Sequence, residues 1–150
     1  MIGQFLLQLP VQEFDVFIVH AGTCNITRQD VGQIEAEFDA TVLHFRDTFP
    51  GVWLGFSAIL PRPHDWEHTM WKVVYVNKLM QHKYVELGLM FFHTYKPFQW
   101  KVQPTVELFR DGLHLSNKGI RKLCQFVRSN MGSKALKFQS QALQSVQDMF

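Results

Sequence analysis

The chain has 150 residues, of which 47% are hydrophobic and 19% are charged, as in a single folded domain rather than a disordered segment. A net charge of +2 excludes polyanion binding through bulk electrostatics alone, and two cysteines are too few for a disulfide framework. The longest apolar runs are too short for a membrane-spanning helix, and no signal peptide is visible, so we expect a cytoplasmic protein.

Three continuous apolar runs predict β-strands that are buried on both faces, as parallel strands are. They are DVFIVHAG (15–22), VWLGFSAIL (52–60) and LGLMFFH (87–93). Each run ends close to turn-forming or polar residues. Because ligands of parallel α/β proteins collect at the carboxyl ends of the strands, we expect the functional residues at this edge of the sheet.

Helical segments separate these runs. The first is capped by Thr27 and directs one apolar stripe inward: Val31, Ile34, Phe38, Val42 and Phe45. The second is capped by Asp65 and directs inward Trp66, Met70, Val73 and Val74. The last is capped by Ser116 and directs inward Ile120, Leu123, Cys124 and Val127. This alternation predicts an α/β protein, a three-layer α/β/α sandwich formed by residues 1–131, followed by a polar, helical or frayed tail at 132–150.

The segment LFRDGLHLSNKG (108–119) holds an aspartate three residues before a histidine, just ahead of the last helix. Such a turn can place the Asp111 carboxylate against one nitrogen of His114 and leave the other nitrogen free, as in a catalytic triad. The alternative is a turn in which Asp111 caps local backbone amides and His114 is an ordinary surface residue. The spacing by itself favours this alternative.

Three motifs in this order, VFIVHAGTCNIT, GFSAILPRP and DGLHLSNKG, resemble those of the SGNH hydrolases, the GDSL-like esterases and lipases. The resemblance covers about residues 1–130 and implies a parallel, flavodoxin-like sheet and cleavage of carboxylic esters. It also implies that His114 is the general base and Asp111 the residue that orients it. With the other motifs present, we favour this interpretation of the turn.

The chain departs from the family pattern at two points. In the Gly-x-Asn-Asp block Gly22 matches, but Cys24 stands at the oxyanion-hole asparagine and Asn25 at the aspartate; a thiol is a weak hydrogen-bond donor. The Gly-Asp-Ser block that carries the nucleophile is absent and would lie upstream of Met1, so we expect an N-terminally truncated domain. Ser57 reads as a core residue and Ser116 as a helix cap. We therefore expect an inactive fragment or pseudoenzyme.

Other candidate sites are weaker. Arg62, at the expected ligand edge, could hold an anionic group or simply bond loop carbonyls. His64 and His68 are spaced for a helix-borne metal, but without a third ligand we expect no metal and no cofactor.

The last helix is basic, which leaves a second hypothesis: a non-catalytic interaction domain of the same fold, of a kind associated with retroelements, that contacts nucleic acid there. We favour this less. We also expect self-association through the edge of the first strand, which would lack its neighbour.

Overall fold

The computed structural model describes residues 16–148, and the side chains of residues 16–132. Three short strands form a parallel sheet in the order β1 (Val16–Val19), β2 (Trp53–Ser57) and β3 (Met90–Phe92). In the register of this sheet Val19 lies opposite Phe56, and Phe56 lies opposite Phe91. The expected strands are therefore present, each shorter than its apolar run.

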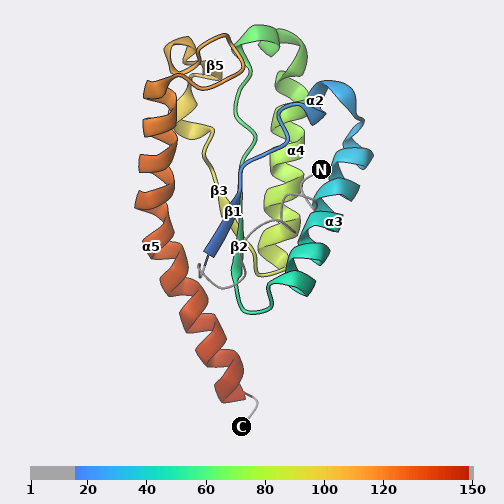
Figure 1. The fold of residues 1–150 in the computed structure, drawn as a ribbon, viewed down its shortest axis with the longest axis vertical. Coiled ribbons are helices and arrows are strands. Elements are labelled where there is room, and N and C mark those ends of the chain that lie inside the picture. Colours follow the sequence, from blue (N-terminus) through green and yellow to red (C-terminus); the bar gives the residue numbers. More distant parts are fainter. Residues whose placement is uncertain (1–15, 149–150) are drawn as a thin grey trace.

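Helices cover both faces of the sheet (Figure 1). On one side lie α3 (Val31–Thr48) and α4 (Trp66–Glu86), and on the other lies α5 (Asn117–Asp148). Short elements connect them: α2 (Asn25–Arg28), the 3-10 helices η1 (Pro63–Asp65), η2 (Lys96–Phe98) and η3 (Val106–Leu108), and a hairpin of β4 (Gln99–Trp100) and β5 (Gln103–Pro104). The three-layer α/β/α sandwich is confirmed.

The main core lies between the sheet and the α3–α4 layer. Alternate strand residues point into it, such as Val19 from β1, Phe56 from β2 and Phe91 from β3. Four residues of the predicted stripe of α3 are buried as expected: Ile34, Phe38, Val42 and Phe45. The fifth, Val31, is only partly buried. Phe56 stacks on Tyr84 of α4 with ring centroids 4.6 Å apart, and burial raises the pKa of the Tyr84 hydroxyl.

The expected N-cap of α3 is wrong by three residues. Thr27 lies inside the one-turn helix α2, so the chain starts α3 from Asp30. The Asp30 carboxylate accepts a hydrogen bond from the backbone N–H of Gln33 at 2.8 Å, and the Gln33 side chain accepts from the backbone N–H of Asp30 at 2.9 Å. This reciprocal pair is a capping box, which satisfies two amides that the helix leaves open.

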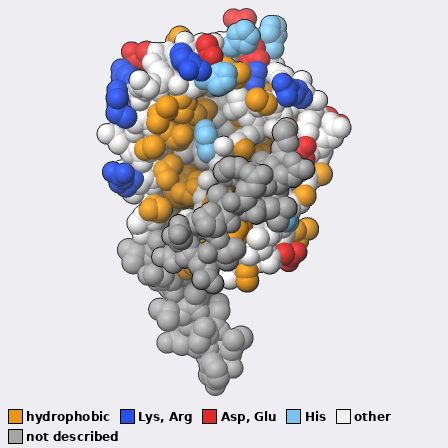
Figure 2. Space-filling view, viewed as in Figure 1, with side chains coloured by type: hydrophobic (Ala, Val, Ile, Leu, Met, Phe, Trp, Pro, Cys, Tyr) orange, Lys and Arg blue, Asp and Glu red, His pale blue; other side chains and the backbone are white. Residues whose placement is uncertain are grey.

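Parts of the predicted inward faces of α4 and α5 are also wrong. Trp66 and Val73 are buried, but Met70 and Val74 are exposed, because the buried face of α4 continues through Thr69, Val76, Asn77, Met80 and Tyr84. On α5, Ile120 and Cys124 are exposed, whereas Leu123 and Val127 are half-buried as predicted. The α5 helix lies on one side of the sheet (Figure 1), and Figure 2 shows hydrophobic side chains gathered at the surface in the same view.

The last helix extends into the segment that was expected to be a helical or frayed tail. It begins at Asn117, directly after the predicted cap Ser116, whose hydroxyl accepts from the Gly119 N–H at 3.1 Å. It then continues without interruption to Asp148, across the boundary expected at residue 132. Within residues 16–148, no helix combines the length and the apolarity needed to cross a bilayer.

Candidate active site

The Asp111–His114 turn is held at both ends. Before it, η3 ends at Leu108, whose carbonyl accepts from the Ser116 N–H at 2.9 Å. Inside the turn, the Arg110 N–H donates to the His114 carbonyl at 2.7 Å. These bonds fix residues 108–116 as a closed loop seated on the start of α5.

Within this loop the two side chains lie in contact, and Asp111 also caps local backbone amides, as the alternative interpretation expects. Oδ2 of Asp111 lies 2.6 Å from Nδ1 of His114, and Oδ1 accepts from the backbone N–H groups of His114 at 2.7 Å and Leu113 at 3.0 Å. The backbone N–H and the imidazole of His114 hold the pKa of the Asp111 carboxyl well below its usual range. An ionised carboxylate only accepts, so Nδ1 carries the hydrogen and Nε2 presents its lone pair. The His114 side chain is 62% exposed and can meet a substrate.

The turn lies at the carboxyl edge of the sheet, as the sequence predicts. Gly112 adopts φ +79°, and its carbonyl accepts from the His64 N–H at 3.0 Å; His64 belongs to η1, which follows β2. A Cβ at residue 112 would stand 3.0 Å from that same nitrogen, so both the backbone conformation and the close contact favour glycine.

Arg62 is a buried residue that links two loops at this edge of the sheet. Arg62 is only 5% exposed. Its Nε and Nη2 donate to the two carboxylate oxygens of Asp65 at 2.8 and 2.7 Å, and its Nη1 donates to the carbonyl of Thr23. Arg62 lowers the pKa of the Asp65 carboxyl. The guanidinium thus joins the loop after β1 to the loop after β2, which is the loop-bonding arrangement rather than an open anion site.

The block after β1 keeps its glycine, but the side-chain amide of its asparagine is already engaged. Gly22 has φ +105°, and a Cβ there would lie 2.9 Å from the Ile59 side chain. Cys24 is exposed at the start of α2. The Asn25 amide donates to Gln29 at 2.7 Å and to Glu37 at 2.9 Å. In the described part of the chain, no hydrogen bond or ion pair joins Cys24, Asn25 or Arg62 to the dyad.

None of the described residues places a hydroxyl within hydrogen-bonding distance of Nε2 of His114. Ser57 is 2% exposed at the end of β2, Ser116 caps α5, and the Ser129 hydroxyl donates to the Gln125 carbonyl at 2.8 Å. Likewise, no cluster of three or more metal-ligating side chains occurs within the described region.

The structure reveals a histidine that the sequence reasoning missed. His20 Nδ1 lies 2.7 Å from Ser57 Oγ, which lies 2.7 Å from Thr94 Oγ1, and Thr94 donates to the Ala58 carbonyl at 3.0 Å. The sequence signal that could have indicated this chain of bonds is a polar residue at or near the end of each strand: His20, Ser57 and Thr94.

A carbonyl can only accept, so the Ala58 carbonyl receives a hydroxyl hydrogen from Thr94 at 3.0 Å or from Ser57 at 3.4 Å. Which of His20 and Ser57 donates to the other depends on the tautomer of the imidazole. Because Ser57 is only 2% exposed, its hydroxyl offers little access to a substrate, and we interpret the pair as a structural link between the strand ends.

Two solved structures share the architecture. A Streptococcus pneumonia protein described as a platelet activating factor aligns with a TM-score of 0.73 and 19% identity, and a Bacteroides fragilis protein described as an acylhydrolase aligns with 0.67 and 11%. The chain has an acylhydrolase-like fold. The alignments cover 85% and 83% of this chain but only 66% and 62% of the two neighbours. No family model matches the sequence, and the comparison with curated proteins found no match.

Proposed function

We propose that this chain is the Asp–His part of an SGNH-type carboxylic ester hydrolase, unable to hydrolyse esters by itself. The observation that carries the proposal is the 2.6 Å contact between Asp111 Oδ2 and His114 Nδ1, at the carboxyl edge of an acylhydrolase-like sheet. The contact fixes the tautomer in which Nε2 can accept a proton from an attacking hydroxyl.

The same geometry supports the expected inactivity. Nε2 of His114 meets no described hydroxyl, and by the resemblance of the motif Cys24 stands where the family has its oxyanion-hole asparagine. Loss of a triad nucleophile lowers turnover on the order of a million-fold, and what remains depends on the oxyanion hole. The chain should therefore show no serine-dependent turnover.

The test is hydrolysis of a short-chain aryl ester by the wild type, His114→Ala and His82→Ala, each with and without a fluorophosphonate probe. His82 is an exposed histidine on α4 and controls for the loss of one imidazole. We expect the same slow rate in all six samples. A saturable rate that is lost both with His114→Ala and with the probe would show that a serine of this chain is the nucleophile.

A second arm tests whether His114 can act as a base. A segment whose strand ends in Gly-Asp-Ser, joined ahead of Met1, should produce ester hydrolysis that requires both the added serine and His114. Hydrolysis that survives His114→Ala would contradict the role assigned to the dyad.

The second candidate is a non-catalytic interaction domain of the same fold. It is favoured by the same absence of a described hydroxyl beside His114. Unchanged binding of a partner by His114→Ala and Asp111→Ala would support it, since a scaffold does not need the dyad.

A further inference from the structure

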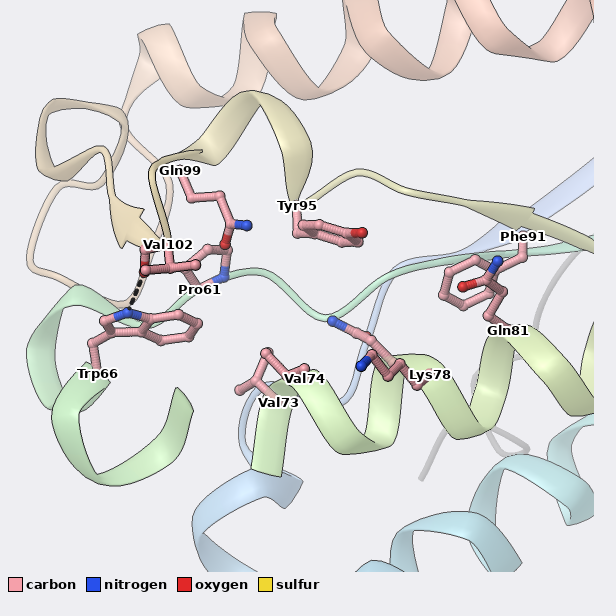
Figure 3. A pocket seen from close by; sticks show the side chains of 11 residues that line it. Pro61, Trp66, Val73, Val74, Lys78, Gln81, Phe91, Tyr95, Gln99 and Val102 are labelled. Carbon is pink, nitrogen blue, oxygen red and sulfur yellow. Dashed lines mark hydrogen bonds between the residues drawn. The ribbon is translucent and has the colours of Figure 1, made fainter. Parts of the chain in front are cut away.

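A cavity that neither Asp111 nor His114 lines lies between α4 and the segment that follows β3 (Figure 3). Its volume is about 230 Å³. The walls are mostly apolar, with Trp66, Val73 and Val74 on the helix side, and Pro61, Tyr95 and Val102 opposite. Pockets of this composition, with a few polar groups at defined points, are typical of small-molecule sites.

One wall is held in place at an energetic cost. The turn of the β4–β5 hairpin consists of Lys101 and Val102, at φ +46° and +63°. Positive φ is unfavourable for any residue with a Cβ and especially for a β-branched valine. The Trp66 indole N–H donates to the Val102 carbonyl at 2.8 Å and fastens this turn to the start of α4. Positive φ at both central residues is what a two-residue hairpin turn of type I′ requires, and the Trp66 bond holds this turn over the cavity.

The polar groups of the cavity favour an anion. Lys78 is its charged lining residue, and no acid accompanies it there. Within the described part of the chain the Lys78 ammonium has no hydrogen-bond or ion-pair partner, and Figure 3 shows it directed toward the space between α4 and Tyr95. The Asn77 amide, by contrast, is occupied: it accepts from the Ile59 N–H at 2.7 Å and donates to the Ile59 carbonyl at 2.9 Å.

The volume limits the size of the ligand. A water-sized group takes about 30 Å³ of liquid volume, and a methylene is of similar size, so the cavity holds roughly seven or eight such groups. A linear chain of this length would be covered by Trp66, Val73 and Val102. A carboxylate at its end would reach Lys78 at the solvent side, where an ion pair keeps part of its hydration.

We propose that this cavity binds a linear aliphatic carboxylate of about eight carbons, with its chain among Trp66, Val73 and Val102 and its carboxylate on Lys78. The site is separate from the Asp111–His114 dyad, and the proposal does not rest on the hydrolase function. The proposal is the same whether the free carboxylate is released by cleavage of an ester or is already present as the free acid.

In the experiment the full chain is titrated with hexanoate, octanoate and dodecanoate. Binding is measured by calorimetry and by ¹⁵N spectra of the tryptophan indoles. Octanoate should bind saturably and shift the Trp66 indole signal. Hexanoate, shorter by two methylenes, should bind on the order of tenfold more weakly, since each buried methylene contributes about fourfold. Dodecanoate should also bind more weakly, because it exceeds the cavity.

Two pairs of variants locate the site. Lys78→Gln should weaken octanoate binding about five- to tenfold and leave 1-octanol binding unchanged. Lys122→Gln on α5 removes a lysine charge outside the cavity and should change the affinity for neither octanoate nor 1-octanol. Val74→Trp should block the cavity, whereas Leu43→Trp, at a residue that is 64% exposed on α3, should not. Thermal unfolding checks that each variant is folded.

Three outcomes would overturn the proposal. One is the absence of saturable octanoate binding to the folded wild type. Another is equal affinity in wild type and Lys78→Gln. The third is a set of spectral shifts that leaves the Trp66 indole unchanged.

Discussion

At the scale of single residues, His20 shows how a neighbouring buried group affects a proton. The residue as a whole is exposed, but its ring contacts the buried Ser57, and the desolvation there lowers the pKa of the imidazole below its ordinary 6.5. Below about pH 6.5 the unfolded chain therefore takes up a proton that the folded chain does not. The free energy of unfolding should fall as the pH decreases through this region and level off below the lowered pKa.

Denaturant unfolding between pH 5 and 8 measures this prediction. His20→Gln should flatten the rise of stability with pH, whatever its effect on the absolute stability. His82→Gln, at an exposed histidine, should retain the slope. An unchanged slope in His20→Gln would show that another group is responsible.

Asp111 and His114 give a second prediction at this scale. Because the ionised carboxylate accepts from Nδ1, neutral His114 should occur as the Nδ1–H tautomer, which ¹⁵N chemical shifts of the ring report directly. Asp111→Ala should shift the ring toward the Nε2–H tautomer that free histidine prefers. Nε2–H in the wild type would contradict the proposed base.

At the scale of elements, the contact of α5 with η3 determines where the dyad lies. A Cβ on Gly119 would stand 2.1 Å from the Leu108 carbonyl oxygen, an atom of the backbone that cannot turn aside. Gly119→Ala should therefore destabilise the fold by about 1–3 kcal/mol, as overpacked sites do, and should shift the amide signals of the dyad loop.

Gly132 on the same helix is the matched control, because a Cβ there meets nothing within 4 Å. Gly132→Ala should be neutral or stabilise the helix by up to about 1 kcal/mol. Equal unfolding free energies of the two variants, measured in denaturant, would contradict the close contact of α5 with η3.

At the scale of the whole molecule, the basic face of α5 tests the interaction-domain hypothesis. Lys118 is already paired with Glu107 at 2.7 Å, and the net charge is only +2. We expect weak binding to nucleic acid that does not depend on sequence and falls with salt as counterions are released. Fluorescence anisotropy of the wild type and of Lys118→Glu/Arg121→Glu/Lys122→Glu measures this; submicromolar, sequence-dependent affinity at physiological salt would overturn it.

The sequence by itself determined the features that depend on neighbouring residues. Continuous apolar runs specified buried parallel strands, and the three- and four-residue spacing on α3 specified its inner face. The bonds of Asp111 within its own turn were also local, but the spacing by itself favoured an ordinary turn, and only the resemblance of the three motifs favoured the Asp111–His114 pair.

Only the tertiary structure decided which distant groups meet. The bonds of His20 to Ser57 and of Ser57 to Thr94 each join residues 37 positions apart, and Trp66 meets Val102 across 36. Whether Arg62 faced a ligand or Asp65, and whether Met70 or Met80 entered the core, depended on how α4 settles against the sheet. No local pattern encodes such contacts, because they form only when the layers pack.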